Sequence, residues 1–428
     1  MRGARQEVTL CILIDALRYD YITKDNTPFL WSVSEQGEIG SLYAPFGFTG
    51  DSCWFAGQYP QDSDEGMMFQ YCPATSPFKF ARYIPNFLGK VPLVERIIRR
   101  GIGEYIRRSS KFKRLREGNA LFIPRCDFSF LPFWDYTYKI VPWDERYPLT
   151  SVFDLLRSQG MSWYYHGHPQ YKCNLETVRE RFFREQPADY PFVFLFISDL
   201  DDLGHTFGPN SDQVREKLGE IDRFAEEAYS LLKKSVNVIN LLVFGDHGMV
   251  EVEREFDMAG YLKKTKAIVG KHYLYFLDST IARFWFFNPG AEEEITGVLA
   301  EIGHGTLITE DRFEEFKIDY GHNRFGELFW VCEGGEIILP NYFQGKKRVK
   351  GMHGYLPAVR DNHSALVLKR GKTSSSQVAE GFPTPSAASL RDRVGGKTSS
   401  SQMAGGAQPL VNVFSMLSSL LGVSSAGD

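Results

Sequence analysis

Carboxylate and imidazole side chains recur in four short segments of this chain, and their types suit the binding of metal ions. The segments lie at residues 14–18, 201–205, 244–249 and 352–355. The candidate ligands within them are Asp15, Asp201, His205, Asp246, His247 and His353. Oxygen and nitrogen ligands without thiolates are typical of zinc or manganese used for hydrolysis, and not of a closed structural zinc site. The set offers enough donors for two divalent ions.

These candidate ligands lie far apart along the chain, so only a folded scaffold can bring them together. Apolar runs at 8–14, 192–197 and 239–244 each lead to one of them. Such runs are typical of strands that are buried on both faces of a parallel sheet. Helical patterns between the runs lie at 28–35, 151–158 and 212–234. This alternation predicts an α/β fold with a doubly wound sheet and a site at the carboxyl ends of its strands.

Two stretches interrupt the alternation and predict inserted caps. Residues 61–149 form a basic and then aromatic cap, and residues 251–345 form a small α/β cap. The predicted catalytic core is discontinuous and comprises residues 1–60, 150–250 and 346–428. Within it, the stretch at 371–406 is rich in Ser, Gly, Ala and Thr, which predicts a flexible loop. After that loop, the apolar pattern at 409–421 predicts a helix that docks back on the core.

Composition narrows the class of protein and its compartment. The chain has 428 residues and a net charge of −4, so it gives no global sign of a nucleic-acid polymer as partner. Its six cysteines are scattered without a CxxC pair, which favours buried thiols in a reducing compartment. No signal peptide and no apolar run of the ~20 residues that span a bilayer are recognised. We therefore expect a cytoplasmic protein, and its oligomeric state is not predicted.

Taken in order, the ligand segments resemble the alkaline phosphatase superfamily, and most closely its type I phosphodiesterase/nucleotide pyrophosphatase branch. The motifs that carry the resemblance are Asp-x-x-x-His at 201–205 with Gly208-Pro209, Asp-His-Gly-Met at 246–249 and His-Gly-Tyr at 353–355. The resemblance covers residues 8–59, 192–249 and 320–368. It implies an alkaline-phosphatase-like fold, in which a mostly parallel sheet lies between helices and carries two inserted cap regions.

The resemblance also implies how the ligands divide between two divalent ions, with zinc expected and manganese as the alternative. One ion is held by Asp201, His205 and His353, and the other by Asp15, Asp246 and His247. Such a pair clamps the attacking and leaving oxygens of an in-line displacement at phosphorus. A Thr or Ser bound to the second ion attacks and forms a phospho-enzyme intermediate, which water then hydrolyses.

The nucleophile is the place where this sequence departs from the family pattern. The Gly-x-Tyr-Pro ending at 57–60 matches, but counting back ten positions from Gly57 reaches Gly47, which has no side chain. Thr49 is the first candidate, because a Thr before Gly can cap a helix and present its hydroxyl at the helix start. Thr49 would then also be a ligand of the second ion. Ser52 is the alternative, and a third interpretation is that both hydroxyls are only capping groups.

The sequence allows more than one role for the basic and aromatic cap. Residues 90–116 contain ten basic and two acidic residues, with arginines at helical spacing among isoleucines. A helix of this kind can lie on an anionic membrane surface, guide an anionic substrate or form a solvated lid. The dense aromatics at 121–143 predict either a stacking wall for a substrate or the small core of the inserted lobe.

The sequence thus predicts a metal-dependent phosphoric ester hydrolase that cleaves phosphodiester or pyrophosphate bonds of a small-molecule substrate. One alternative in the same superfamily is a phosphomonoesterase, phosphotransferase or sulfatase. Another, from a different class, is a catalytically inactive metal-binding module, which the altered nucleophile segment favours and the complete ligand set disfavours.

Overall fold

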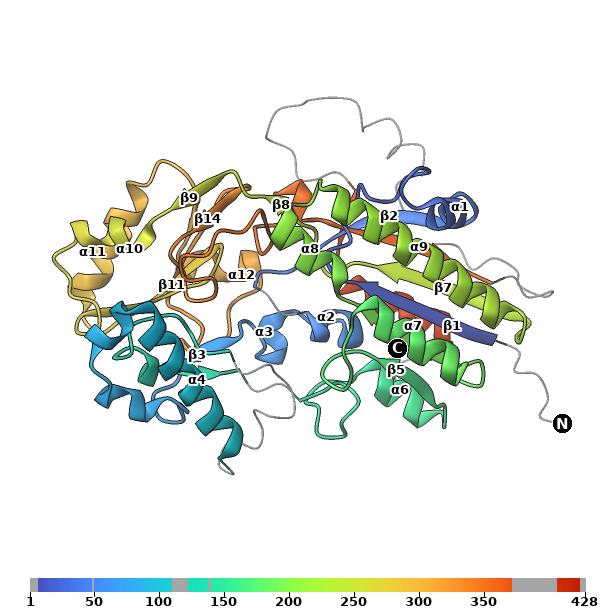
Figure 1. Cartoon of the computed structure of the whole chain (residues 1–428), viewed down its shortest axis with the longest axis horizontal. Helices are drawn as coiled ribbons and strands as arrows, with labels where there is room; N and C mark the ends of the chain where they lie inside the picture. Colours follow the sequence, from blue (N-terminus) through green and yellow to red (C-terminus); the bar gives the residue numbers. More distant parts are fainter. Residues whose placement is uncertain (1–6, 48–49, 110–121, 138–139, 372–405, 424–428) are drawn as a thin grey trace.

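The computed structural model describes residues 7–47, 50–109, 122–137, 140–371 and 406–423. Figure 1 shows two lobes side by side, with the central sheet and its helices on the right and the inserted segments on the left. The candidate ligands come from elements of the sheet lobe near its border with the inserted lobe.

The central sheet has the strand order β17-β2-β16-β7-β1-β6-β5. In that order the strands are Ala407–Pro409, Glu38–Tyr43, Ser364–Lys369, Val238–Phe244, Glu7–Ile14, Phe192–Ile197 and Trp163–His166. β5, β6, β1 and β7 run parallel to one another, whereas β16 is antiparallel to both of its neighbours. The sheet is therefore mixed and mostly parallel, as the sequence predicts.

Alternate residues of β1 face two different helical layers, which explains its unbroken apolar run. Leu10 and Ile12 pack into one core with α1, α7 and α9, whereas Cys11 and Leu13 pack into a second core with α2, α6 and α14. The helices of the first layer are Pro28–Gln36, Leu175–Glu185 and Asp212–Lys233, and those of the second are Asp51–Ala56, Val152–Ser158 and Asn412–Leu421. A strand that is buried on both faces requires apolar side chains at every position.

The inserted lobe is built around a second, antiparallel sheet with the order β10-β11-β13-β12. These strands are Tyr273–Leu277, Ile281–Phe286, Leu328–Val331 and Thr306–Ile308. Helices α4 (Pro92–Arg108) and α11 (Pro289–Ala300) and the pair of strands β3 (Phe69–Tyr71) and β4 (Trp134–Tyr136) pack with it. The shorter helices of the lobe are Pro60–Ser63, Met258–Tyr261 and Phe313–Phe316, and its two-stranded sheet joins β9 (Arg254–Phe256) to β14 (Glu336–Ile338).

The two predicted caps share one hydrophobic core. Phe69, Phe128 and Trp134 from the first cap pack with Phe276 and Trp285 from the second. The aromatic segment therefore supplies core side chains, which favours the second of the two interpretations given above. The division of the chain into a core and two caps remains a prediction, and the predicted loop at 371–406 lies almost wholly outside the described residues.

Among the described residues, no helix combines the length and the apolar character that crossing a bilayer requires. The six cysteines all lie in the described parts of the chain, and none of them is joined in a disulfide.

Candidate metal centre

Two of the candidate ligands stand where neighbouring parallel strands end. Asp15 directly follows β1, and its main-chain N–H donates to the Ile197 carbonyl oxygen at the end of β6, over 2.8 Å. Asp246 follows the last residue of β7, Phe244, by two positions. Because the carboxyl ends of parallel strands meet at one edge of a sheet, these carboxylates converge.

The turn after β1 holds Asp246 in place through its main chain. Ala16 has a φ of 58°, a left-handed conformation that costs a residue with a Cβ roughly 1–2 kcal/mol. In this conformation the Ala16 N–H donates to Asp246 Oδ1 over 3.2 Å, and the His247 N–H donates to the same oxygen over 3.0 Å. The other oxygen, Asp246 Oδ2, lies 3.6 Å from His247 Nε2. Backbone donors thus orient this carboxylate.

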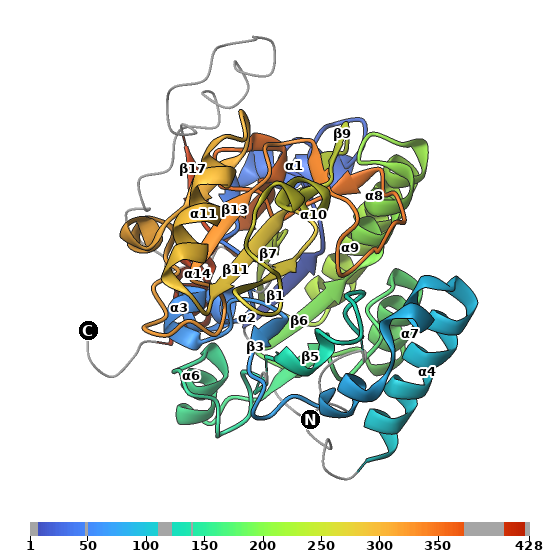
Figure 2. The same cartoon turned by 90° about the vertical axis from the view of Figure 1, so that its left-hand side faces the viewer.

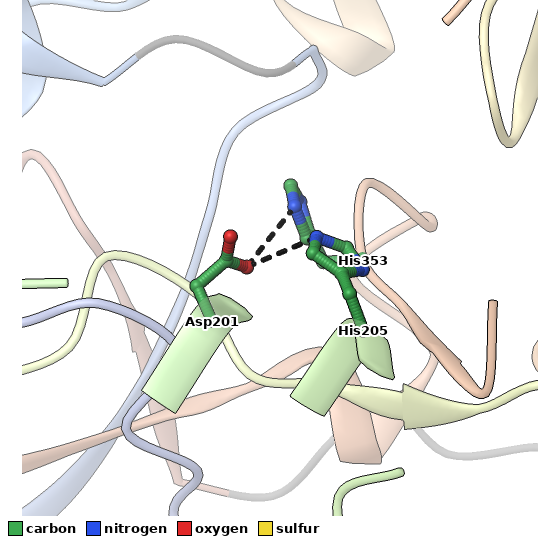
Figure 3. A group of neighbouring side chains, drawn as sticks. All are labelled: Asp201, His205 and His353. Carbon is green, nitrogen blue, oxygen red and sulfur yellow. Dashed lines mark ion pairs between the residues drawn. The ribbon is translucent and has the colours of Figure 1, made fainter. Parts of the chain in front are cut away.

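Helix α8 (Asp199–Phe207) contributes two more ligands from a single face. Asp201 and His205 are four residues apart, so they are neighbours on the helix surface, and His205 Nε2 lies 3.2 Å from Asp201 Oδ1. Figure 3 shows the Asp201 carboxylate pointing toward this imidazole and toward that of His353, whose Nε2 lies 3.5 Å away.

His353 reaches the centre through a short antiparallel ladder. β15 (Gly351–Met352) pairs with β8 (Val250–Glu251), so the residue after β15 comes close to the segment before β8. As a result the rings of His353 and His247 stack, with centroids 3.8 Å apart and planes inclined by 12°. This ladder joins segments that are about a hundred positions apart in the sequence.

Main-chain carbonyls fix the tautomers of two of the histidines. His205 Nδ1 lies 2.8 Å from the Gly351 carbonyl oxygen, and His247 Nδ1 lies 2.8 Å from the Gly248 carbonyl oxygen. A carbonyl oxygen only accepts, so each Nδ1 carries the proton and donates it. In the neutral ring, Nε2 then keeps its lone pair for the other side, which is the usual arrangement of histidines that bind metals, and a cation would take the place of the Nε2 proton.

The ligand atoms gather into two overlapping groups. In each group the atoms lie within 4.8 Å of one another: one consists of Asp201, His205 and His353, and the other of Asp15, Asp201 and His247. Asp201 therefore belongs to both groups. The structure brings the six predicted ligands into one pocket, with Asp246 beside the second group and not within it.

The donor set fits divalent cations. The Oδ1 atoms of Asp15 and Asp201 are buried and have no hydrogen-bond partner among the described residues. A buried carboxylate oxygen without a partner costs free energy unless a cation or a donor meets it. The six side chains retain between 15% and 22% of their exposure, so the pocket is accessible from solvent.

The charges in the pocket also favour a cation. Burial, followed by the neighbouring carboxylates of Asp246 and Asp201, raises the pKa of Asp15 well above its ordinary value. Burial alone would lower the pKa of His247, but Asp246 and Asp15 outweigh it and raise that pKa to about 10. Burial also favours the protonated form of Asp201, yet His205 and the other imidazoles hold its pKa below its ordinary value. The raised pKa of Asp15 reflects repulsion between neighbouring carboxylates, which a cation bound among them would relieve.

Of the two candidate nucleophiles, the structure describes only Ser52, because Thr49 lies outside the described residues. The N-cap position of α2 is occupied by Gly50, so the helix begins at Asp51 and the expectation that Thr49 caps it is wrong. Ser52, in the first turn of α2, is 1% exposed, and its hydroxyl accepts a hydrogen bond from Ser63 Oγ over 3.1 Å.

The sequence reasoning missed the residues that position the ligands. Gly351 and Gly248 offer the carbonyls that fix the histidine tautomers, and Ala16 offers the N–H that holds Asp246. The signal that was available is the glycine near each His motif. A Cβ at Gly248 would lie 2.3 Å from the Asp361 carbonyl oxygen, so only glycine fits at that position.

Comparison with known proteins agrees with the fold and with the ligand motifs. A mostly parallel sheet between helices, with carboxylates and imidazoles at its strand ends, defines an alkaline-phosphatase-like α/β protein. The family model for "Type I phosphodiesterase / nucleotide pyrophosphatase" matches residues 9–356. The chain therefore belongs to the type I phosphodiesterase/nucleotide pyrophosphatase family.

The chain matches each of these curated relatives over less than half of the relative's own length. Ectonucleotide pyrophosphatase/phosphodiesterase family member 5 of Homo sapiens is 27% identical over 206 residues, which is 46% of this chain and 40% of the relative. Family member 7 of Homo sapiens is 29% identical over 104 residues, 23% of this chain and 21% of the relative. Alkaline phosphatase PhoV of Synechococcus elongatus is 32% identical over 69 residues, 16% of this chain and 12% of the relative.

Solved structures resemble the whole chain. The human family member 5 superposes with a TM-score of 0.62 at 17% identity, covering 98% of this chain and 96% of that one. An inactive form of the murine family member 5, in complex with AMP, gives a TM-score of 0.57 at 17% identity, with the same two coverages. At this identity the likeness establishes the fold.

Proposed function

We propose that this protein is a metal-dependent phosphoric ester hydrolase that cleaves phosphodiester or pyrophosphate bonds in a small-molecule substrate. The observation that carries the proposal is the convergence of six carboxylate and imidazole side chains in one cluster, where two carboxylate oxygens are buried without hydrogen-bond partners among the described residues. Membership of the type I phosphodiesterase/nucleotide pyrophosphatase family supports the class of reaction.

The ligand residues would act as follows. Asp201, His205 and His353 hold one cation, and Asp15, Asp246 and His247 hold the other. Two divalent cations, zinc or manganese, would supply electrostatic stabilisation to the charged phosphoryl group and to the attacking and leaving oxygens. Because Asp201 belongs to both ligand groups, its carboxylate would contribute negative charge to both cations.

We assign the nucleophile to Thr49, which would also be a ligand of the second cation. Thr49 Oγ would lose its proton to solvent and bond to phosphorus while the bond from phosphorus to the leaving oxygen breaks, and that oxygen would take up a proton from solvent. Water would then attack the phosphothreonine ester, break its Oγ–P bond, release the phosphate and return a proton to the Thr49 hydroxyl. The burial of Ser52 supports this choice, since the residue is 1% exposed and its hydroxyl already accepts a hydrogen bond from Ser63. A hydroxyl that attacks phosphorus must reach the substrate.

The test compares substrates and variants on protein that has been stripped with a chelator and reloaded with zinc or manganese. Wild-type protein should hydrolyse bis(4-nitrophenyl) phosphate faster than 4-nitrophenyl phosphate. Thr49→Ala should remove nearly all turnover while the metal content stays at about two ions per chain. Ser52→Ala, the matched hydroxyl deletion, should retain most of the turnover. If Ser52→Ala abolishes turnover and Thr49→Ala does not, the nucleophile is Ser52.

A phosphomonoesterase is the second candidate function, and the similarity of 69 residues to alkaline phosphatase PhoV favours it. Faster turnover of the monoester in the assay above would establish this alternative. Turnover of neither ester, with metal demonstrably bound, would instead identify an inactive metal-binding module.

The cytoplasmic location also remains a proposal. It is supported by six cysteines, none of which forms a disulfide. Fractionation of cells that express the full chain tests it, and recovery of the chain in the medium would contradict it.

A further inference from the structure

The inserted lobe exposes a cluster of large apolar side chains on α4 and on the segment before it. The side chains and their exposed fractions are Tyr83 80%, Phe87 65%, Val91 50%, Leu93 64% and Ile97 62%. We call these five residues the apolar patch. Single exposed apolar residues are common on proteins, but five within fifteen positions require an explanation.

Helix α4 has two apolar sides, and the described residues cover only one of them. Ile102 and Ile106 are buried in the core of the inserted lobe, and Arg99 fixes that side by donating to the Cys126 carbonyl oxygen over 2.7 Å. Leu93 lies nine positions before Ile102, which is two and a half turns, and therefore points to the opposite side of the helix. Both views place α4 at the outer edge of the molecule (Figures 1 and 2).

Unpaired cations surround the apolar patch. Lys90, Arg96 and Arg100 are exposed, and none of them forms an ion pair with an acidic side chain among the described residues. The two acidic residues of α4, Glu95 and Glu104, each pair with other arginines of the same helix. The outer side of α4 is therefore both apolar and positively charged.

We propose that the apolar patch and these cations dock on the surface of an anionic phospholipid bilayer. Leucine, isoleucine and phenylalanine side chains can enter the boundary between head groups and acyl chains, while lysine and arginine meet the phosphates. A nucleic acid would also attract the cations, but it offers no apolar medium for the aliphatic side chains. The combination favours a lipid surface. This proposal is independent of the catalytic assignment.

Co-sedimentation of the full chain with vesicles tests the proposal. The protein should sediment with vesicles of phosphatidylcholine and phosphatidylserine, and less with vesicles of phosphatidylcholine alone or at high salt. Leu93→Ser with Ile97→Ser should lower partitioning at least about tenfold, since both substitutions replace an aliphatic side chain that would enter the apolar boundary with a polar one. Arg96→Glu with Arg100→Glu should lower it by a similar factor at low salt only.

Matched controls separate docking from general effects on the fold. Ile268→Ser removes an isoleucine that is 53% exposed outside the patch, and Arg223→Glu with Lys234→Glu reverses two exposed charges on or next to α9. Both controls should sediment like the wild type, and circular dichroism should show that all variants are folded.

Two outcomes would overturn the proposal. One is unchanged sedimentation of both patch variants. The other is a concentration-dependent dimer that the Leu93 and Ile97 substitutions abolish, in a protein that does not bind vesicles, because the patch would then be an interface between two copies of the chain.

Discussion

Gly351→Ala should weaken metal binding although residue 351 is not itself a ligand. A Cβ at this position would lie 2.6 Å from the Gly204 carbonyl oxygen and 2.9 Å from Met249 Sδ. The same junction carries both anchors of His205: the Lys350 N–H donates to its carbonyl oxygen over 2.9 Å, and its Nδ1 donates to the Gly351 carbonyl oxygen over 2.8 Å. The added methyl group would therefore push α8 away from β15.

The size of the effect follows from the geometry. An ordinary contact begins at 3.4 Å, so the main-chain atoms must separate by about 0.8 Å, which exceeds the roughly 0.5 Å that such a site tolerates. We expect the free energy of unfolding to fall by about 1–3 kcal/mol, as in other overpacked positions. Loss of a group that orients a ligand typically lowers metal affinity about 10–100-fold.

The assay is calorimetric titration of the metal-free protein with zinc, together with thermal unfolding in chelator. Gly297→Ala is the matched control, because Gly297 lies in helix α11 and a Cβ there meets nothing within 4 Å. That variant should bind zinc like the wild type and gain roughly 0.5–1 kcal/mol of stability. Wild-type zinc affinity in Gly351→Ala would refute the role given to the junction between α8 and β15.

Two further predictions concern buried charges. Asp246→Asn should lower zinc affinity and hydrolysis together, because it removes a charge beside the second ligand group, and unchanged metal content in elemental analysis would count against the ligand role. Asp278→Asn should destabilise the inserted lobe by roughly 3–5 kcal/mol in denaturant unfolding, because it leaves Arg283, 2.7 Å from Asp278, buried without a counter-charge. Arg254→Ala, at an exposed ion pair, is the control and should change stability little; equal effects at the two positions would contradict the reasoning.

The strands that lead to the ligands could be predicted because they depend on local patterns. The runs at 8–14, 192–197 and 239–244 became β1, β6 and most of β7, since a strand that is covered on both faces needs an unbroken apolar sequence. The helices at 28–35 and 212–234 likewise appear as α1 and α9, within one residue at each end.

Four strands of the same sheet were not predicted. β16 lies between β7 and β2 and is the antiparallel member of the sheet, whereas β5 and β17 are short and β2 is only partly buried. Their place in the order depends on hydrogen bonds to strands that are distant in the sequence, and a short apolar run does not encode its partner.

The sequence by itself determined the chemistry of the pocket, because carboxylates and imidazoles at strand ends select hard or borderline cations whatever the details of packing. It also determined that the aromatic segment is apolar enough to form a core. Only the tertiary structure decided that this core is shared between both caps, and that the outer side of α4 stays uncovered.

The tertiary structure alone also placed Asp201 within reach of both ligand groups and fixed the His205 tautomer through Gly351, which is 146 positions away. The physical reason is the range of the interactions involved. Periodicity and ligand type are properties of neighbouring residues, whereas the contact between α8 and β15 forms only when packing of the whole sheet lobe offsets the entropy of closing a long loop.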